Sequence, residues 1–192
     1  MVAQPKPRMT VDEFLVWAEG RPGRYELVDG EVFAMSPERV RHAEVKASAY
    51  LALRSALART NLPCRALPDG MSLRIDRTTI FEPDALVYCG ARADPDAIEI
   101  TNAVIVVEVV SPSTASVDSG RKLAGYFSLA SVAHYLMIDP VKRVVIHHAR
   151  AAEGPIMTRI AIEGTLDLTP PGLTLPVADL FADLPPPAEP AA

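Results

Sequence analysis

The amino-acid sequence predicts a mixed α/β fold of the α+β kind, with a mixed central β-sheet flanked by helices. Three observations support this prediction. Strand-like and helix-like segments follow one another along the chain. Residues 103–110, AVIVVEVV, are apolar on both faces of a strand, which is typical of a strand buried in the centre of a sheet. Residues 103–139 read as strand, helix and strand, and such a crossover fits a mixed sheet.

Length and composition predict one folded unit. A chain of 192 residues, 49% of them hydrophobic, can bury a sizeable core, and we expect a single domain over residues 1–184. Residues 185–192, PPPAEPAA, predict a disordered tail. No apolar run is long enough to cross a bilayer and the first residues lack a signal-peptide pattern, so we expect a cytoplasmic protein with no membrane contact. Cys64 and Cys89 lack CxxC spacing and are expected to be separate thiols.

Hydrophobic periodicity and turn residues predict the individual elements. Helices are expected over about 10–19, 37–60 and 120–130. Strands are expected over about 25–28, 31–35, 64–67, 71–75, 80–88, 103–110, 134–139, 143–148 and 156–162. Beyond these strands the pattern is too weak to assign an element.

Local signals predict where three of these elements begin or turn. Thr10 and Glu13 have the spacing of a capping box at the start of a helix. Asp29-Gly30 is a strong two-residue hairpin signal. Ser36 followed by Pro37 predicts an N-cap and the first turn of the long helix. The expected apolar stripe of that helix consists of Val40, Ala43, Ala47, Tyr50, Leu51, Leu57 and Ala58.

Two carboxylates are predicted to enter the core from successive strands. Glu108 lies in the buried strand, on the same face as Val106 by strand alternation. A lone buried carboxylate is unfavourable unless it has a cation, a hydrogen-bond partner or a proton. Asp84 opens the apolar segment of the preceding strand, so the pair suggests a divalent-metal site. Lys122, near the start of the next helix, supplies a cation, and Tyr126 shares its face at i,i+4.

These residues resemble the motifs of the PD-(D/E)xK nuclease superfamily, and in particular of its Uma family of restriction endonucleases. The matching residues are Pro83-Asp84, Glu108 in VVEVVSPST, and Lys122 and Tyr126 in GRKLAGYF. The segment YELVDGE at 25–31 and Met35-Ser36-Pro37 with His42 resemble the opening of the family. The resemblance runs from about Thr10 to Leu184.

The sequence departs from the general superfamily pattern in one place. The superfamily lysine normally stands two residues after the acid, and this chain has Val110 there. In the Uma family the basic residue comes instead from the following helix. The resemblance therefore implies that Lys122 takes the place of that lysine.

The resemblance implies a restriction-endonuclease-like fold and Mg²⁺-dependent hydrolysis of DNA phosphodiester bonds, with Mn²⁺ as a substitute ion. Asp84, Glu108 and a backbone carbonyl near Val109 would hold the metal, because Mg²⁺ prefers oxygen ligands. Lys122 would orient the attacking water or help to deprotonate it. The candidate catalytic residues are thus Asp84, Glu108, Lys122 and Glu26, with His42 and Tyr126 in support. Cleavage of both strands of a duplex would favour a homodimer.

The acidic composition of the chain favours functions other than cleavage of DNA. The net charge of −5 and a pI of about 5.4 count against tight binding of nucleic acid, which needs clustered Lys and Arg. They favour an alternative, a catalytically idle module on the same fold that binds nucleic acid or protein, and a weaker option is hydrolysis of a small phosphate ester. No GxxxxGK[ST], GxGxxG, HExxH or GxSxG motif occurs in the sequence. His147 and His148 point to opposite faces of a strand and are interpreted as structural.

Overall fold

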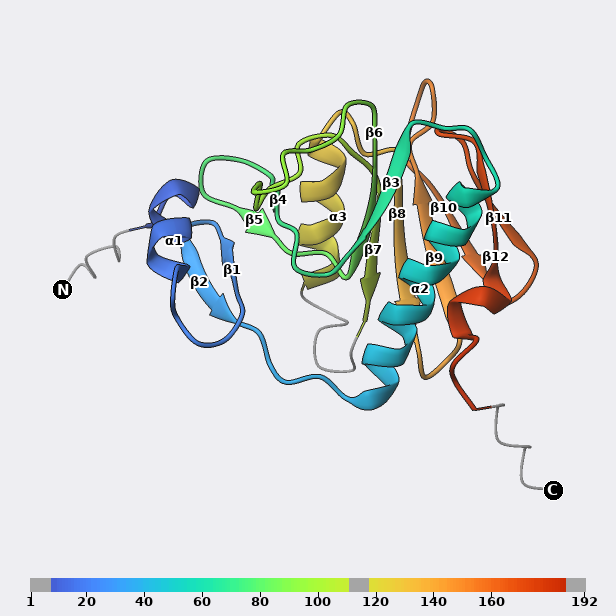
Figure 1. The fold of residues 1–192 in the computed structure, drawn as a ribbon, viewed down its shortest axis with the longest axis horizontal. Coiled ribbons are helices and arrows are strands. Elements are labelled where there is room, and N and C mark those ends of the chain that lie inside the picture. The colour runs from blue at the N-terminus through green and yellow to red at the C-terminus, as the bar shows by residue number, and fades with distance from the viewer. Residues whose placement is uncertain (1–7, 111–117, 186–192) are drawn as a thin grey trace.

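The computed structural model describes residues 8–110 and 118–185, and its centre is a six-stranded mixed sheet (Figure 1). The strand order is β10-β9-β8-β7-β6-β3, with β7 and β8 parallel and the other neighbours antiparallel. The strands are β3 (Cys64–Pro68), β6 (Ala85–Cys89), β7 (Ala103–Val109), β8 (His134–Asp139), β9 (Val144–Ala149) and β10 (Met157–Ala161). The predicted crossover is confirmed, because helix α3 (Asp118–Ser128) connects the two parallel strands.

Helices cover both faces of this sheet, which confirms the predicted α+β class (Figure 1). Helix α2 (Val40–Ala58) shares a buried cluster with Ile105, Val107 and Val109, the residues of β7 that point to one side. Val106 points to the other side and shares a cluster with Tyr126 and Phe127 of α3. The side of α2 is completed by a two-stranded sheet and a 3₁₀ helix, namely β11 (Thr165–Leu168), β12 (Leu173–Pro176) and η1 (Val177–Phe181).

The N-terminal part of the chain forms a smaller sheet with the order β2-β1-β5-β4. Its elements are β1 (Tyr25–Val28), β2 (Glu31–Ala34), β4 (Leu73–Arg74), β5 (Ile80–Phe81) and the helix α1 (Val11–Ala18). The predicted capping box is confirmed, since Thr10 Oγ1 accepts from the Glu13 backbone N–H and the Glu13 carboxylate accepts from the Thr10 N–H. The predicted hairpin is also confirmed, with φ of 51° at Asp29 and 79° at Gly30, as a tight two-residue turn requires.

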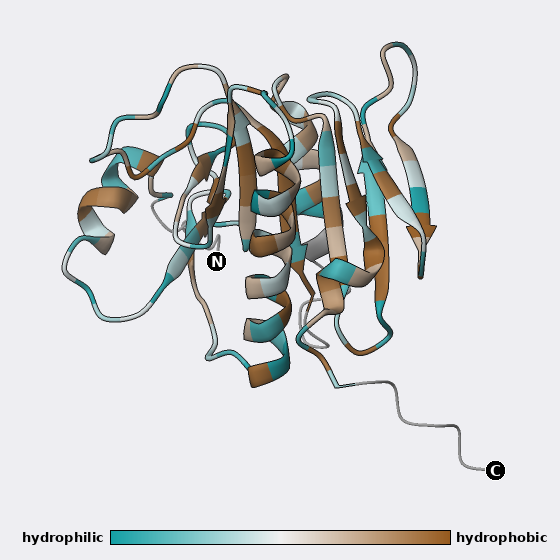
Figure 2. Cartoon of the chain, turned by 45° about the vertical axis from the view of Figure 1, so that its right-hand side comes forward, coloured by the Kyte–Doolittle hydropathy of each residue, from teal (hydrophilic) through white to brown (hydrophobic). Residues whose placement is uncertain are grey.

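The structure corrects the start and the buried face of the long helix. Helix α2 begins at Val40 with Arg39 as its N-cap, so the Ser36-Pro37 signal does not start it. The predicted stripe is wrong at most of its positions, because Val40 is 74% and Leu51 is 51% exposed, although Leu57 is buried and Tyr50 is half-buried. Apolar and polar residues alternate around this helix (Figure 2), and contact with the sheet decides which side is buried. The buried residues are Val45, Lys46, Ser48, Ala49, Ala52, Leu53, Ala56 and Leu57.

The strand predicted over 80–88 is broken in two. Strand β5 pairs with β1 and β4 in the smaller sheet, whereas β6 pairs with β3 and β7 in the central sheet. The break falls at Glu82-Pro83-Asp84, where proline cannot donate a backbone hydrogen bond to a neighbouring strand. The chain therefore passes from one sheet to the other at these residues, and Asp84 lies at the junction.

The prediction that the cysteines are separate thiols is wrong. Cys64 of β3 and Cys89 of β6 are direct cross-strand partners with Cα atoms 4.0 Å apart, and they form a disulfide. Their separation of 25 residues gives no hint of this pairing, which depends on the register of two antiparallel strands.

After α3, the described part of the chain contains the predicted strands and three further elements. The β8–β9 hairpin and β10 are confirmed, whereas β11, β12 and η1 carried too weak a pattern to be assigned. His147 contacts His134 and His148 contacts Thr158, which agrees with a structural role on opposite faces. The SPST motif within 111–117 and the tail at 186–192 lie outside the described residues. Within the described ranges, no helix is both long and apolar enough to cross a membrane.

Two glycines of α3 provide a matched test of how this helix packs. A Cβ at Gly125 would lie 2.8 Å from Phe81 Cε2 and 3.4 Å from Ile75 Cγ2, whereas a Cβ at Gly120 would meet nothing within 4 Å. Alanine is a better helix former than glycine by up to about 1 kcal/mol. Overpacking a core costs about 1–3 kcal/mol. We therefore expect Gly120→Ala to raise the free energy of unfolding and Gly125→Ala to lower it, as measured by urea denaturation. Equal effects at the two positions would contradict the close approach of α3 to β5.

Candidate active site

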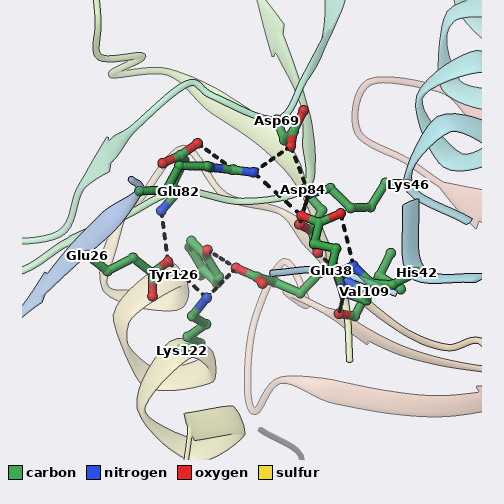
Figure 3. Close-up of polar contacts among 12 residues, drawn as sticks. Glu26, Glu38, His42, Lys46, Asp69, Glu82, Asp84, Val109, Lys122 and Tyr126 are labelled. Carbon is green, nitrogen blue, oxygen red and sulfur yellow. Dashed lines mark hydrogen bonds and ion pairs between the residues drawn. The ribbon is translucent and has the colours of Figure 1, made fainter. Parts of the chain in front are cut away.

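The predicted site residues come together at the junction of the two sheets (Figure 3). Asp84 comes from the turn between β5 and β6, and Glu108 lies one residue before the end of β7. Lys122 comes from α3 and Glu26 from β1. The side chains of all four are buried, although each of them is charged in water at neutral pH. Such residues are rarely buried unless they are paired, so their partners define the site.

Lys122 joins the two sheets through a pair of carboxylates. Its Nζ lies 3.0 Å from Glu108 Oε1 and 3.0 Å from Glu26 Oε1. Tyr126, one helical turn further along α3, donates its hydroxyl hydrogen to Glu108 Oε1 at 2.5 Å. The i,i+4 spacing places both side chains on the helix face that the crossover lays against β7. Glu26 is held in turn by the backbone N–H of Glu82, at 3.0 Å from its Oε1.

Asp84 is fixed to the end of the central strand by the backbone of Val109. Its Oδ2 accepts a hydrogen bond from the Val109 N–H at 2.7 Å. The carbonyl oxygen of Val109 lies 2.5 Å from His42 Nε2. Both backbone groups of Val109 are thus engaged by the site, one by an acid from the preceding turn and the other by an imidazole from α2.

Lys46 is a site residue that the sequence did not single out. Its Nζ lies 3.0 Å from Asp84 Oδ1, 2.7 Å from Asp69 Oδ2 and 2.5 Å from Glu38 Oε1. Burial alone would lower the pKa of Lys46, but the charge of Asp84 and the hydrogen bonds that Lys46 donates to Asp69 and Glu38 outweigh burial and raise this pKa above its usual value. The one available signal was its position four residues after His42, which places both on one side of α2.

Arg24 extends this network to the outer side of the site. Its guanidinium contacts Asp69 Oδ2 at 2.9 Å and Glu82 Oε1 at 2.5 Å. Around the junction, six carboxylates face three permanently basic side chains among the described residues. The carboxylates belong to Glu26, Glu38, Asp69, Glu82, Asp84 and Glu108, and the bases are Arg24, Lys46 and Lys122. This excess of negative charge favours the binding of a cation.

The pKa of Glu108 reflects this crowding. Burial raises it most, the charge of Lys122 lowers it, and the charges of Asp84 and Glu26 raise it again, which brings the pKa to about 7. Burial raises the pKa of Tyr126 well above its usual value, and the charges of Glu108 and Glu26 raise it further. The Tyr126 hydroxyl therefore stays a donor. Glu108 therefore changes its charge near neutral pH.

The donors at this junction fit a hard divalent cation. In the described part of the chain, no three His, Cys, Asp or Glu side chains converge as they would in a closed metal site. Asp84, Glu108 and the Val109 carbonyl are nevertheless oxygen donors near the end of β7, where Asp84 binds the Val109 N–H and Glu108 precedes Val109 in the strand. Mg²⁺ usually takes only one or two carboxylates and keeps several of its waters. Two carboxylates and one carbonyl are therefore a suitable set for Mg²⁺.

A mixed sheet between helices, with Glu108 near the end of β7, Asp84 just before β6 and a lysine from the crossover helix, is the arrangement of a restriction-endonuclease-like fold. A sequence model of the Uma2 family, described as "Putative restriction endonuclease", matches residues 11–179. The chain belongs to this family, as its resemblance predicted.

Two similar proteins match this chain over nearly its whole length. The uncharacterized protein slr1290 of Synechocystis sp. is 24% identical, and the match covers 94% of this chain and 95% of that protein. A crystal structure from Anabaena variabilis, described as a "putative nuclease belonging to DUF820", superposes with a TM-score of 0.69. It shares 17% identity and covers 91% of this chain and 98% of its own, and this likeness supports the fold.

The raised pKa of Glu108 predicts how stability depends on pH in the presence of a chelator. The unfolded chain releases this proton near the ordinary value of 4.5 and the folded chain only near 7. The stability that this group contributes is therefore fully present below about pH 4.5 and is lost as the pH rises through about 7. Glu108→Gln stays neutral, so its unfolding free energy relative to wild type should rise by up to about 3 kcal/mol between about pH 5 and about pH 8.

Urea denaturation at several pH values measures this difference. The same substitution at Glu163, whose side chain is exposed, is the control and should leave the pH dependence unchanged. Parallel curves for Glu108→Gln and wild type would show that Glu108 keeps an ordinary pKa.

Proposed function

We propose that this protein is a Mg²⁺-dependent endonuclease that hydrolyses phosphodiester bonds in DNA. The observation that carries the proposal is the meeting of Lys122 with Glu108 at 3.0 Å, next to the backbone of Val109 that binds Asp84. Membership in a family of restriction endonucleases supports the same function. The two acids and the lysine are the groups that such hydrolysis requires.

Asp84, Glu108 and the carbonyl oxygen of Val109 would hold the metal ion. The chemistry that a bound Mg²⁺ would supply here is polarisation of the scissile phosphate and neutralisation of charge on the leaving oxygen. Mn²⁺ takes similar ligands and is expected to replace it. The excess of carboxylates at the junction supports this requirement for a cation, since an anionic phosphate would otherwise be repelled.

Lys122 would act on the attacking water and on the charge that develops in the transition state. An ammonium group donates three hydrogen bonds, so it can orient a water molecule and stabilise the oxygens of the phosphorane. Its contacts with Glu26 and Glu108 hold it in place before substrate arrives. Tyr126 fixes Glu108 from the same helix. Glu26 and Tyr126 would therefore be positioning residues.

A second function is favoured by the acidic composition of the chain. With a net charge of −5, the protein could be a module on the same fold that binds a nucleic acid or a protein without cleaving it. This alternative gives no reason for burying Asp84, Glu108 and Lys122 together. A cleavage assay distinguishes the two functions.

We expect wild-type protein to nick supercoiled plasmid in Mg²⁺ or Mn²⁺ at low salt and to be inactive in EDTA. Removal of one electrostatic group from such a site slows the reaction by about 10²–10³-fold. Glu108→Gln and Lys122→Met should each lose at least that much activity, as measured by gel electrophoresis. Lys142→Met, at a lysine whose side chain is 78% exposed, is the matched control and should cleave like wild type.

Two results would contradict this function. Cleavage that survives both substitutions would place the chemistry elsewhere in the chain or in a contaminant. Failure to cleave in any of these metals, together with binding of the same DNA, would favour the non-catalytic module.

A further inference from the structure

Each proposed metal ligand is already paired with a basic side chain. Asp84 Oδ1 lies 3.0 Å from Lys46 Nζ, and Glu108 Oε1 lies 3.0 Å from Lys122 Nζ. The carbonyl oxygen of Val109 lies 2.5 Å from His42 Nε2. Three oxygen donors therefore face three nitrogen groups (Figure 3).

The three basic residues come from two different helices. Lys122 comes from α3, on the same face of the sheet as Glu108. Lys46 and His42 lie one turn apart on α2, and Glu38 contacts both of them, at 2.5 Å and 3.5 Å. Lys46 and His42 thus form one group, which meets Asp84 and Val109 from α2.

The position of Lys46 conflicts with metal binding at Asp84. Asp84 Oδ2 is occupied by the Val109 N–H at 2.7 Å, and Lys46 lies against the other oxygen. A cation bound to Oδ1 would meet the ammonium group at close range, and two like charges at that separation repel each other strongly. Lys46 and a divalent cation would therefore compete for the same oxygen.

Lys46 has a second set of partners to which it can withdraw. Glu38 Oε1 and Asp69 Oδ2 lie 2.5 Å and 2.7 Å from its Nζ. These acids are 29% and 36% exposed, whereas the side chain of Asp84 is 6% exposed. Leaving Asp84 would move the ammonium toward the outer edge of the site without leaving it unpaired, which avoids the cost of an uncompensated buried charge.

We propose that Lys46 is an internal counter-cation that holds Asp84 in the metal-free protein, and that a divalent cation displaces it onto Asp69 and Glu38. This inference rests on the proposed function for the identity of the metal ligands. Lys46 then stabilises the empty site and weakens the binding of the metal. It regulates the affinity of the site rather than taking part in hydrolysis.

The test is the affinity of the full chain for Mn²⁺ alone, measured by titration calorimetry and by the electron paramagnetic resonance of free Mn²⁺. A single nearby charge shifts a charged equilibrium by about 10–1000-fold. Lys46→Met should therefore bind Mn²⁺ at least about tenfold more tightly than wild type and should melt at a lower temperature in EDTA. Lys142→Met is the matched control and should change neither quantity.

The outcomes separate this inference from the proposed function. If wild type binds Mn²⁺ and Lys46→Met binds it equally or more weakly, Lys46 is not a competitor, while the metal site stands. If neither protein takes up Mn²⁺, the metal-dependent function fails and the inference fails with it. Uptake by Lys46→Met at concentrations where wild type takes up none would support the inference directly.

A second comparison covers the case in which Lys46→Met does not fold. Asp69→Asn removes a partner to which Lys46 withdraws, whereas Glu82→Gln removes the same charge from an acid that contacts Arg24. Asp69→Asn should weaken Mn²⁺ binding by about tenfold more than Glu82→Gln, by the same charge argument. Equal losses would show that only the total negative charge matters, and would overturn the displacement of Lys46.

Discussion

Burial of carboxylates at the junction of the two sheets is the constraint on which the rest of the structure depends. Glu108 lies in a strand that is otherwise apolar, and its charge is tolerated because Lys122 and Tyr126 reach it from α3. Glu26 shares the same ammonium group, so the smaller sheet must lie against this helix. One lysine therefore links the crossover helix, the central sheet and the N-terminal sheet.

On the opposite side of the junction, a second buried carboxylate is also paired with a lysine from a helix. Asp84 lies where proline breaks the chain into two strands, and the backbone of Val109 fixes one of its oxygens. Lys46 brings the charge that Asp84 requires, and this contact buries a lysine on a side of α2 that is otherwise mostly apolar. The acids that would hold a metal ion are thus also the groups that hold the elements together. If these acids act as proposed, activity and stability depend on the same charges.

Much of the site could be predicted from neighbouring positions in the sequence. The alternation of a strand placed Glu108 on one face, and the spacing of a helix placed Lys122 beside Tyr126, because both depend only on local geometry. Lys46 and Arg24 could not be found in this way. Each is an ordinary charged residue in the sequence, and its importance comes from acids of other segments, such as Asp84 for Lys46 and Glu82 for Arg24.

The sequence by itself determined much of the local structure of this protein, namely the capping box of α1, the β1–β2 hairpin, the buried strand and the crossover that follows. These depend on interactions within a few residues, which backbone geometry fixes. Only the tertiary structure decided which side of α2 is buried, where the strand at 80–88 divides, and that Cys64 meets Cys89. Each of these depends on the register and packing of distant segments, and the free energy of those contacts outweighs local preference.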